Sequence, residues 1–292
     1  MSRSGPFLGI FLMMAAMTLF PVKDGFAKLL GDTYLPVGLA WLQYTFMWLA
    51  LAPVVAKMHG AAALIPRPLP MQALRGCLIL GAVCLFYWAL NYIPLADTTA
   101  MTFVGPLVTT AVSPLFLGEK VGIRRWMAVL VGFAGVLIVL RPDFGGERIG
   151  YVIGLAAGIC IGLFYVANRR LASADPPLGS ALHSALFGAL LPIPLLPWIW
   201  VPLQPADAGF LGGFVVLGLV GQAMLVNAFR YGQASLVSPF LYWAIVSSTV
   251  FGWFVFGDFP DLFTWIGAAI LILAGIYIMA REARAAEAAA SG

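Results

Sequence analysis

The chain has 292 residues, of which 62% are hydrophobic and only 10% are charged, and its mean hydropathy is +0.98. Soluble domains carry about 45–50% apolar and about 25% charged residues. This composition therefore excludes a soluble enzyme, a disordered chain and, despite a net charge of +4, a soluble nucleic-acid-binding protein.

Ten apolar stretches, separated by short gaps rich in Gly, Pro and charge, predict an all-α integral membrane protein. They cover residues 6–29, 35–57, 73–93, 97–118, 124–141, 149–169, 178–199, 209–230, 235–257 and 262–280. Membrane strands need only about ten residues, so these lengths favour helices. A cleaved signal peptide is the alternative for the first stretch. Because it lacks a small-residue cleavage site and contains Lys23 and Asp24, we interpret it as a retained helix.

The cations of the chain predict its orientation. With the amino terminus in the cytoplasm, twelve of the 16 Lys and Arg residues fall in cytoplasmic segments. The four outside are Lys23, Lys28, Arg141 and Arg148. The positive-inside rule therefore predicts a multi-pass protein of the cell (inner) membrane with both termini in the cytoplasm.

An internal repeat is visible in the sequence. Residues 89–126 align without gaps on residues 228–265, an offset of 139. The matched positions are Tyr92 with Tyr231, Gly118 with Gly257, Glu119 with Asp258 and Trp126 with Trp265. Chance similarity between leucine-rich helices is the alternative explanation, but the matched Tyr, Gly, acidic and Trp positions argue against it.

The repeat has a topological consequence. The third stretch pairs with the eighth, so corresponding helices lie five crossings apart and the two halves have opposite orientations. We therefore predict ten transmembrane helices as two inverted five-helix repeats, residues 1–142 and 143–281, around a central cavity, followed by a cytoplasmic tail, 282–292. Inverted repeats are typical of transporters.

Polar and aromatic side chains inside the apolar stretches predict where a cargo binds. Thr99, Phe103, Pro106 and Thr110 share one helix face, and the offset of 139 repeats that face in the second half. Amide side chains are costly in lipid and should face protein or water. The predicted substrate-binding residues are Gln43, Tyr87, Asn91, Thr99, Phe103, Gln222, Ser238 and Tyr242.

These groups suit a zwitterion. Amides and hydroxyls supply donors for a carboxylate and acceptors for an ammonium group, and aromatic rings offer stacking and cation–π contacts. The alternative is that the hydroxyls bond to their own helix backbone and the rings serve packing or the membrane interface.

A few residues are candidates for gating. Lys23 and Asp24 lie in the outer part of the first stretch, where we interpret them as gate or interface residues. Pro21 and Pro106 lack an N–H donor and are candidate hinges, with static kinks as the alternative. Clustered His, Cys or acidic ligands and nucleotide-binding motifs are missing from the sequence, so we expect no catalytic residue, metal or cofactor.

The repeated motifs resemble those of the drug/metabolite transporter superfamily of the EamA type. The residues that carry the resemblance are Ala89-Leu90-Asn91-Tyr92, Pro106 and Gly118-Glu119 in the first half, and Ala228-Phe229-Arg230-Tyr231 and Gly257-Asp258 in the second. Within the superfamily the chain looks most like the aromatic amino-acid exporter branch. It departs from the pattern with Asp258 in place of Glu, and with Ile245 at the position that corresponds to Pro106.

The residues and the resemblance together imply a transporter. We expect export of small zwitterionic metabolites, with aromatic and other neutral amino acids favoured, by alternating access and facilitated transport. The partners would be a small-molecule cargo and the lipid bilayer, without nucleic acid, and the protein would act as a monomer. Export of lipophilic cationic drugs or other metabolites is the alternative, and a membrane-embedded enzyme is disfavoured.

Overall fold

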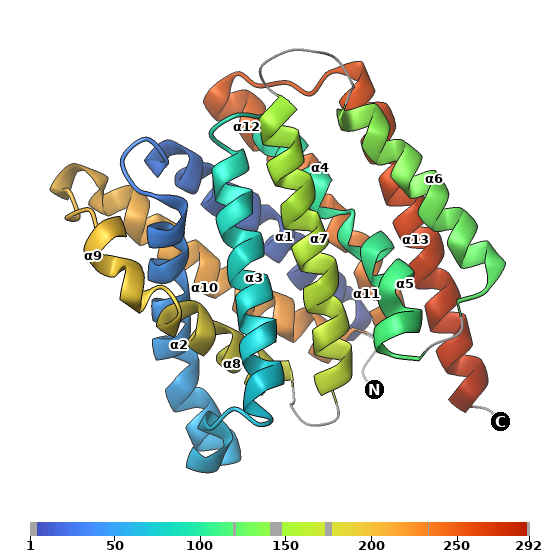
Figure 1. Ribbon diagram of the computed structural model, residues 1–292, viewed down its shortest axis with the longest axis horizontal. Coiled ribbons are helices and arrows are strands. Elements are labelled where there is room, and N and C mark those ends of the chain that lie inside the picture. The colour runs from blue at the N-terminus through green and yellow to red at the C-terminus, as the bar shows by residue number, and fades with distance from the viewer. Residues whose placement is uncertain (1–4, 119–120, 141–147, 173–176, 233, 291–292) are drawn as a thin grey trace.

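The computed structural model describes residues 5–118, 121–140, 148–172, 177–232 and 234–290, and every regular element within them is a helix (Figure 1). Glu119 of the repeated motif lies outside the described residues. The elements are α1 (Gly5–Leu30), α2 (Pro36–His59), η1 (Ala61–Leu64), α3 (Leu69–Ala89), α4 (Leu95–Thr102), α5 (Gly105–Phe116), α6 (Ile123–Leu140), α7 (Arg148–Leu171), α8 (Pro177–Leu190), η2 (Ile193–Leu195), α9 (Leu196–Ile199), η3 (Pro205–Asp207), α10 (Ala208–Tyr231), α11 (Ala234–Val237), η4 (Ser238–Tyr242), α12 (Trp243–Phe256) and α13 (Leu262–Ala290).

Within these described ranges, eight helical segments are long and apolar enough to cross a membrane, and Leu262–Ile278 of α13 is a shorter apolar helix. Large apolar side chains also cover much of the outer surface. Leu115, Phe254 and Ile123, for example, are 83%, 76% and 74% exposed. Lipid is the solvent that accommodates such a surface, so the chain is a multi-pass membrane protein.

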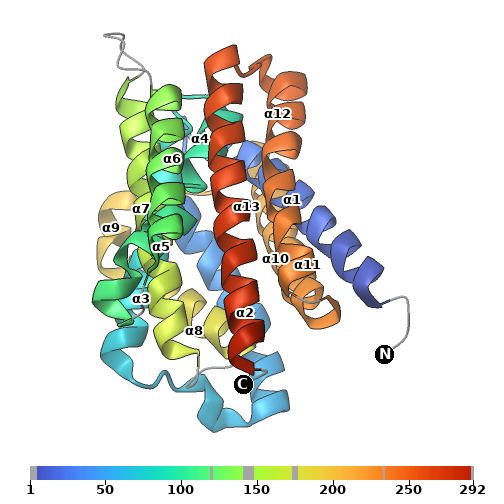
Figure 2. The same ribbon diagram turned by 90° about the vertical axis from the view of Figure 1, so that its right-hand side faces the viewer.

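The helices pack in pairs that join the two parts of the chain. Helix α1 lies against α10, α3 against α7, α2 against α8, and α6 along α13 (Figures 1 and 2). Small residues allow this close approach: a Cβ atom added at Gly158 of α7 would collide with the backbone carbonyl oxygen of Met101, and one added at Gly9 of α1 would lie 2.8 Å from the backbone nitrogen of Gly232.

Three of the predicted stretches are interrupted. The 97–118 stretch divides into α4 and α5, and Pro106 occupies the first turn of α5. The 235–257 stretch divides into α11, η4 and α12, and Pro239 occupies the first turn of η4. Because proline lacks an N–H donor, the first turn is the part of a helix where it costs least. The 178–199 stretch is interrupted between α8 and α9, where Pro192 and Pro194 lie in segment 191–195.

The glycines of the repeated Gly-acid motif end helices. Gly118 follows α5 with a φ of 68°, and Gly257 follows α12 with a φ of 72°. This left-handed conformation is strained for residues with a Cβ atom and is common directly after a helix. The same backbone conformation therefore occurs at glycines related by the offset of 139.

Helix α1 begins and helix α13 ends at the same end of the molecule, which we call the terminal face (Figure 2). The opposite end, where α1 and α12 end, we call the far face (Figure 2).

Candidate functional site

A cavity of about 550 Å³ lies among α1, α2, α3, α4, α5, α7, α10, η4, α12 and α13. Most of the residues predicted to bind cargo or to gate line it. They are Gln43, Tyr87, Thr99, Phe103, Gln222, Tyr242, Pro21, Lys23, Asp24 and Pro106. Both parts of the chain therefore contribute to one site.

The cavity wall contains a charged pair. The Lys23 ammonium lies 2.7 Å from the Asp24 carboxylate, and the side chains are only 7% and 15% exposed. Lys23 also donates a hydrogen bond to the Tyr87 hydroxyl at 2.7 Å and to the Gln43 carbonyl oxygen at 3.3 Å. The Tyr87 hydroxyl in turn donates to the same oxygen of Gln43 at 2.6 Å. A buried ion pair needs such additional hydrogen bonds to offset its desolvation.

Lys23 and Asp24 were interpreted from the sequence as gate or interface residues. Their side chains line the cavity together with the amide of Gln43. A role of these two residues in gating stays a prediction. The helical turn that carries them faces α2 and α3, because Lys23 bonds to Gln43 of α2 and Tyr87 of α3.

Aromatic rings form the part of the wall where the interrupted helices meet. Phe103 lies between α4 and α5, Tyr242 ends η4, and their ring centroids are 4.7 Å apart at an interplanar angle of 32°. The two residues are related by the offset of 139. Thr99 and Thr110 line the cavity nearby, but their hydroxyls donate to the carbonyl oxygens of Leu95 and Pro106 on their own helices.

Helix α7 adds lining residues that the sequence reasoning missed. Ile161, Tyr165 and Arg169 line the cavity at four-residue spacing, which is one face of a helix. Arg169 belongs to the last turn of α7, which lies toward the terminal face (Figure 1). The cavity therefore extends from the Lys23–Asp24 pair toward the terminal face.

An ion pair and aromatic contacts connect α1 and α12 at the far face. The ammonium of Lys28, in the last turn of α1, lies 2.7 Å from the carboxylate of Asp258, directly after α12, and 4.6 Å from the centre of the Phe256 ring. Below this bridge, Phe251 packs against the rings of Phe26 and Phe256, with centroids 6.5 and 6.2 Å apart. These contacts join α1 to the end of α12 at the far face.

Among the described side chains, one predicted binding residue, Asn91, does not line the cavity. Asn91 lies just beyond the end of α3, is exposed and has its carbonyl oxygen next to Gly31. Ser238 begins η4, and its side chain lies outside the described part of the structure.

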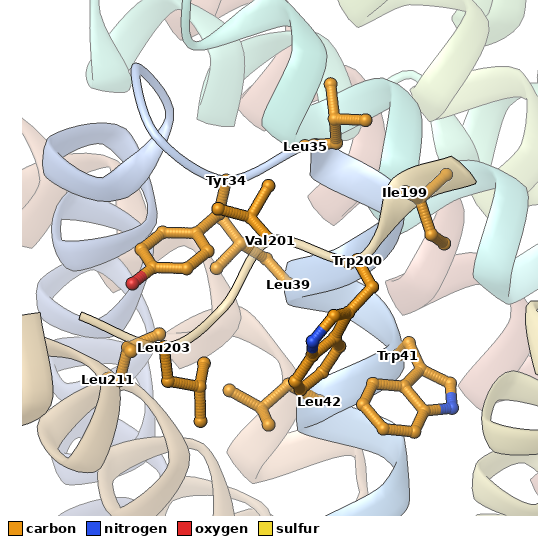
Figure 3. A pocket seen from close by; sticks show the side chains of 11 residues that line it. Tyr34, Leu35, Leu39, Trp41, Leu42, Ile199, Trp200, Val201, Leu203 and Leu211 are labelled. Carbon is orange, nitrogen blue, oxygen red and sulfur yellow. The ribbon is translucent and has the colours of Figure 1, made fainter. Parts of the chain in front are cut away.

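A second, much smaller pocket lies near the far face (Figure 3). It holds about 20 Å³ between the start of α2 and the segment that follows α9, where the rings of Trp41 and Trp200 meet edge to face at 5.7 Å. This volume suits little more than a water molecule. Across the described residues, His, Cys, Asp and Glu side chains nowhere gather in threes as a metal site requires.

Apolar helices long enough to cross a membrane, packed around a central cavity, are the architecture of a membrane transport protein. The chain belongs to the EamA-like transporter family, which matches residues 7–141 and again residues 148–281. The protein is accordingly a transporter and not an enzyme.

The curated relatives of this chain are named for different transported compounds. The chain is 26% identical over 284 residues to the S-adenosylmethionine uptake transporter of Rickettsia bellii, covering 95% of each chain. It is 28% identical to the riboflavin transporter of Vibrio cholerae, covering 96% of this chain and 95% of that one. It is also 28% identical to the pseudopaline exporter CntI of Pseudomonas aeruginosa, covering 92% and 94%. These names do not single out aromatic amino acids as the cargo of the family.

A solved crystal structure shares the fold. It matches this chain with a TM-score of 0.59 and 20% sequence identity, covering 98% of this chain and 100% of its own. At this identity the likeness concerns the fold alone.

Proposed function

We propose that this protein exports small zwitterionic metabolites, with aromatic and other neutral amino acids as the favoured cargoes. The observation that carries the proposal is the Lys23–Asp24 pair on the wall of a cavity that also contains aromatic side chains. A carboxylate and an ammonium group on the cargo would each find an opposite charge there. A ring on the cargo would stack on Phe103 or Tyr242.

The charges of the cavity disfavour cationic drugs as cargo. Among the described residues that line it, Asp24 is the one acid, and it is paired with Lys23. A lipophilic cation would therefore have to compete with Lys23 for this carboxylate, whereas a zwitterion meets both charges. Lipophilic cations remain the alternative to be tested.

Alternating access between two inverted five-helix halves is the mechanism that we propose. Four observations support it. The interrupted helices meet at Phe103 and Tyr242, and Gly118 and Gly257 share one backbone conformation. The family matches the chain twice, and the set of helix pairs stays the same when the helices of one half are exchanged for those of the other. For example, exchanging the halves converts the contact of α1 with α10 into that of α7 with α3. Discontinuous helices at a central site are a recurrent feature of such transporters.

The predicted positions of the termini support the proposed direction of transport. Both termini are proposed to lie in the cytoplasm of a cell whose inner membrane holds the protein, because twelve of the 16 cations then lie inside. The cavity extends toward the terminal face, so in this conformation it would load from the cytoplasm. This is the loading step that an exporter requires.

The names of the relatives widen the set of cargoes to be tested. S-adenosylmethionine, which the Rickettsia protein takes up, combines an amino-acid group with an adenine ring. Riboflavin has an aromatic ring system without an amino-acid group. These two compounds therefore separate recognition of the charged groups from recognition of the ring.

The test is transport into proteoliposomes. Purified protein is supplied with labelled phenylalanine, tryptophan, S-adenosylmethionine, riboflavin or a lipophilic cation, with and without a pH gradient. We expect flux of the amino acids that does not require the gradient, and reduced flux in Gln43→Ala and Tyr242→Ala. Folded protein that moves none of the zwitterions, or only riboflavin or the cation, would contradict the proposal.

A further inference from the structure

Five groups surround the ammonium group of Lys23. The Asp24 carboxylate, the Tyr87 hydroxyl and the Gln43 carbonyl oxygen lie 2.7, 2.7 and 3.3 Å from it. The rings of Tyr87 and Phe214 have their centres 5.2 and 5.4 Å away. We call this set of groups the ammonium cage.

The cage has the composition of a binding site for a ligand amine. An ammonium group offers three donors and no acceptor, and here three oxygen acceptors receive them. Aromatic faces within about 6 Å add cation–π attraction, as in protein sites for organic ammonium ligands. In this structure the protein's own lysine occupies a site of that kind.

The side chain of Lys23 is suited to such an exchange, because its ammonium group is carried on a flexible four-carbon stem. Gly218 of α10 packs closely against that stem, since a Cβ atom added there would lie only 3.3 Å from the Cδ atom of Lys23. Lys23, Asp24, Gln43 and Tyr87 all line the cavity, so a cargo reaches the cage directly.

We propose that Lys23 is an internal substitute for the cargo amine. When a zwitterion enters, its ammonium group takes the place of Lys23 at Asp24, Tyr87 and Gln43, and the released Lys23 ammonium binds the cargo carboxylate. One ion pair within the protein becomes two pairs between protein and cargo, and the net charge in the cavity does not change. This inference rests on the proposed function, since it assumes a zwitterionic cargo.

The exchange explains why the cargo must carry both charges. An amine without a carboxylate would displace Lys23 and leave it unpaired in a buried site. An acid without an amine would bind Lys23 and leave Asp24 unpaired. An uncompensated buried charge is strongly unfavourable. The cage therefore selects zwitterions over simple amines and simple acids.

The test removes the Lys23 ammonium group from the cage by substitution. In purified full-length protein, the binding of phenylalanine and of phenethylamine, which lacks the carboxylate, is measured by titration calorimetry. The wild-type protein is expected to bind phenylalanine at least about tenfold more tightly than phenethylamine. Lys23→Met should reverse this order, because phenethylamine now enters an empty cage and phenylalanine has lost its carboxylate partner.

Lys57→Met is the matched control, because it makes the same substitution at an exposed lysine near the end of α2, outside the cavity. It should behave as the wild type. Lys23→Gln is the second variant, in case Lys23→Met does not fold, and it should also favour phenethylamine because it removes the charge.

The outcomes separate the two proposals. If the wild type transports phenylalanine but neither folded Lys23 variant gains affinity for phenethylamine, the cage proposal is overturned and the proposed function stands. If the wild type binds no zwitterion while Lys23→Met binds phenethylamine, the cage is supported as an amine site and the proposed cargo is wrong.

Discussion

The hydroxyl group of Tyr87 connects two polar groups of the cavity. It accepts a hydrogen bond from Lys23 and donates one to Gln43, and the residue is only 3% exposed. Tyr87→Phe leaves both partners one hydrogen bond short in a buried network. We expect a loss of about 1–3 kcal/mol of stability, measured by thermal unfolding in detergent, and weaker binding of zwitterions.

Tyr92→Phe is the control for this prediction. It makes the same change at a tyrosine that is 42% exposed, a few residues beyond α3. Equal unfolding temperatures and affinities for the two variants would show that the Tyr87 hydroxyl contributes nothing to the site.

At the residue scale, polarity inside apolar stretches located much of the cavity. Gln43 and Gln222 were identified because an amide must avoid lipid, and both line the cavity. Asn91 has the same chemistry, but α3 ends at Ala89, so its amide lies beyond the helix at the far face. Arg169 was counted only as a cytoplasmic charge. Arg169 lies four residues after Tyr165, so the two share one helix face, and this spacing could have placed both of them on the cavity wall.

The charge state of the site was harder to foresee. Lys23 and Asp24 are adjacent in sequence, so periodicity alone places them on different faces of α1. Only the positions of α2 and α3 show that the long lysine side chain returns to its neighbour and to Gln43. The roles of the predicted residues in binding cargo remain predictions.

At the scale of elements, the approach of α13 to η4 positions an aromatic ring. A Cβ atom added at Gly275 of α13 would collide with the hydroxyl of Tyr242. Gly275→Ala should therefore push the Tyr242 ring away from Phe103 and lower the transport rate several-fold. Flux in proteoliposomes measures the effect.

The control is Gly212→Ala in α10, where an added Cβ atom meets nothing within 4 Å. Alanine is favoured over glycine inside a helix by roughly 0.5–1 kcal/mol, so this variant should be at least as stable as the wild type and equally active. Unchanged transport in Gly275→Ala would mean that the position of the Tyr242 ring does not matter.

Helix interruptions were only partly predictable from the sequence. Pro106 marked the first one, although it was interpreted as a hinge in a continuous helix. The second was missed because Ile245 occupies the position that corresponds to Pro106. In the second half the interruption coincides with Pro239, six residues before Ile245, in the first turn of η4. A repeat can thus conserve an interruption while moving the residue that causes it.

At the scale of the whole molecule, the Lys28–Asp258 bridge joins α1 to the end of α12 at the far face. Asp258→Asn weakens it, so the far face should open more often. Accessibility is measured with Gln222→Cys, in a background without the native Cys77, Cys84 and Cys160, using an impermeant maleimide added from the far face. We expect labelling to increase about two- to fivefold, in keeping with a partly exposed ion pair.

Asp32→Asn is the control, because Asp32 is an exposed acid that follows α1 near the same face. It should not change the labelling. Slower labelling or no change in Asp258→Asn would contradict a closing role for the bridge.

The pairing of helices from the two parts of the chain affects how the protein is made. Helices α1 and α3 reach the membrane before the ribosome has translated α10 and α7, against which they pack. Until then the nascent chain exposes Lys23 and Tyr87 without the complete wall around them. Long-range packing of this kind forms late, so two fragments synthesised separately, one ending after α6 and one beginning at α7, should each be degraded alone and be rescued when both are present in the same cell.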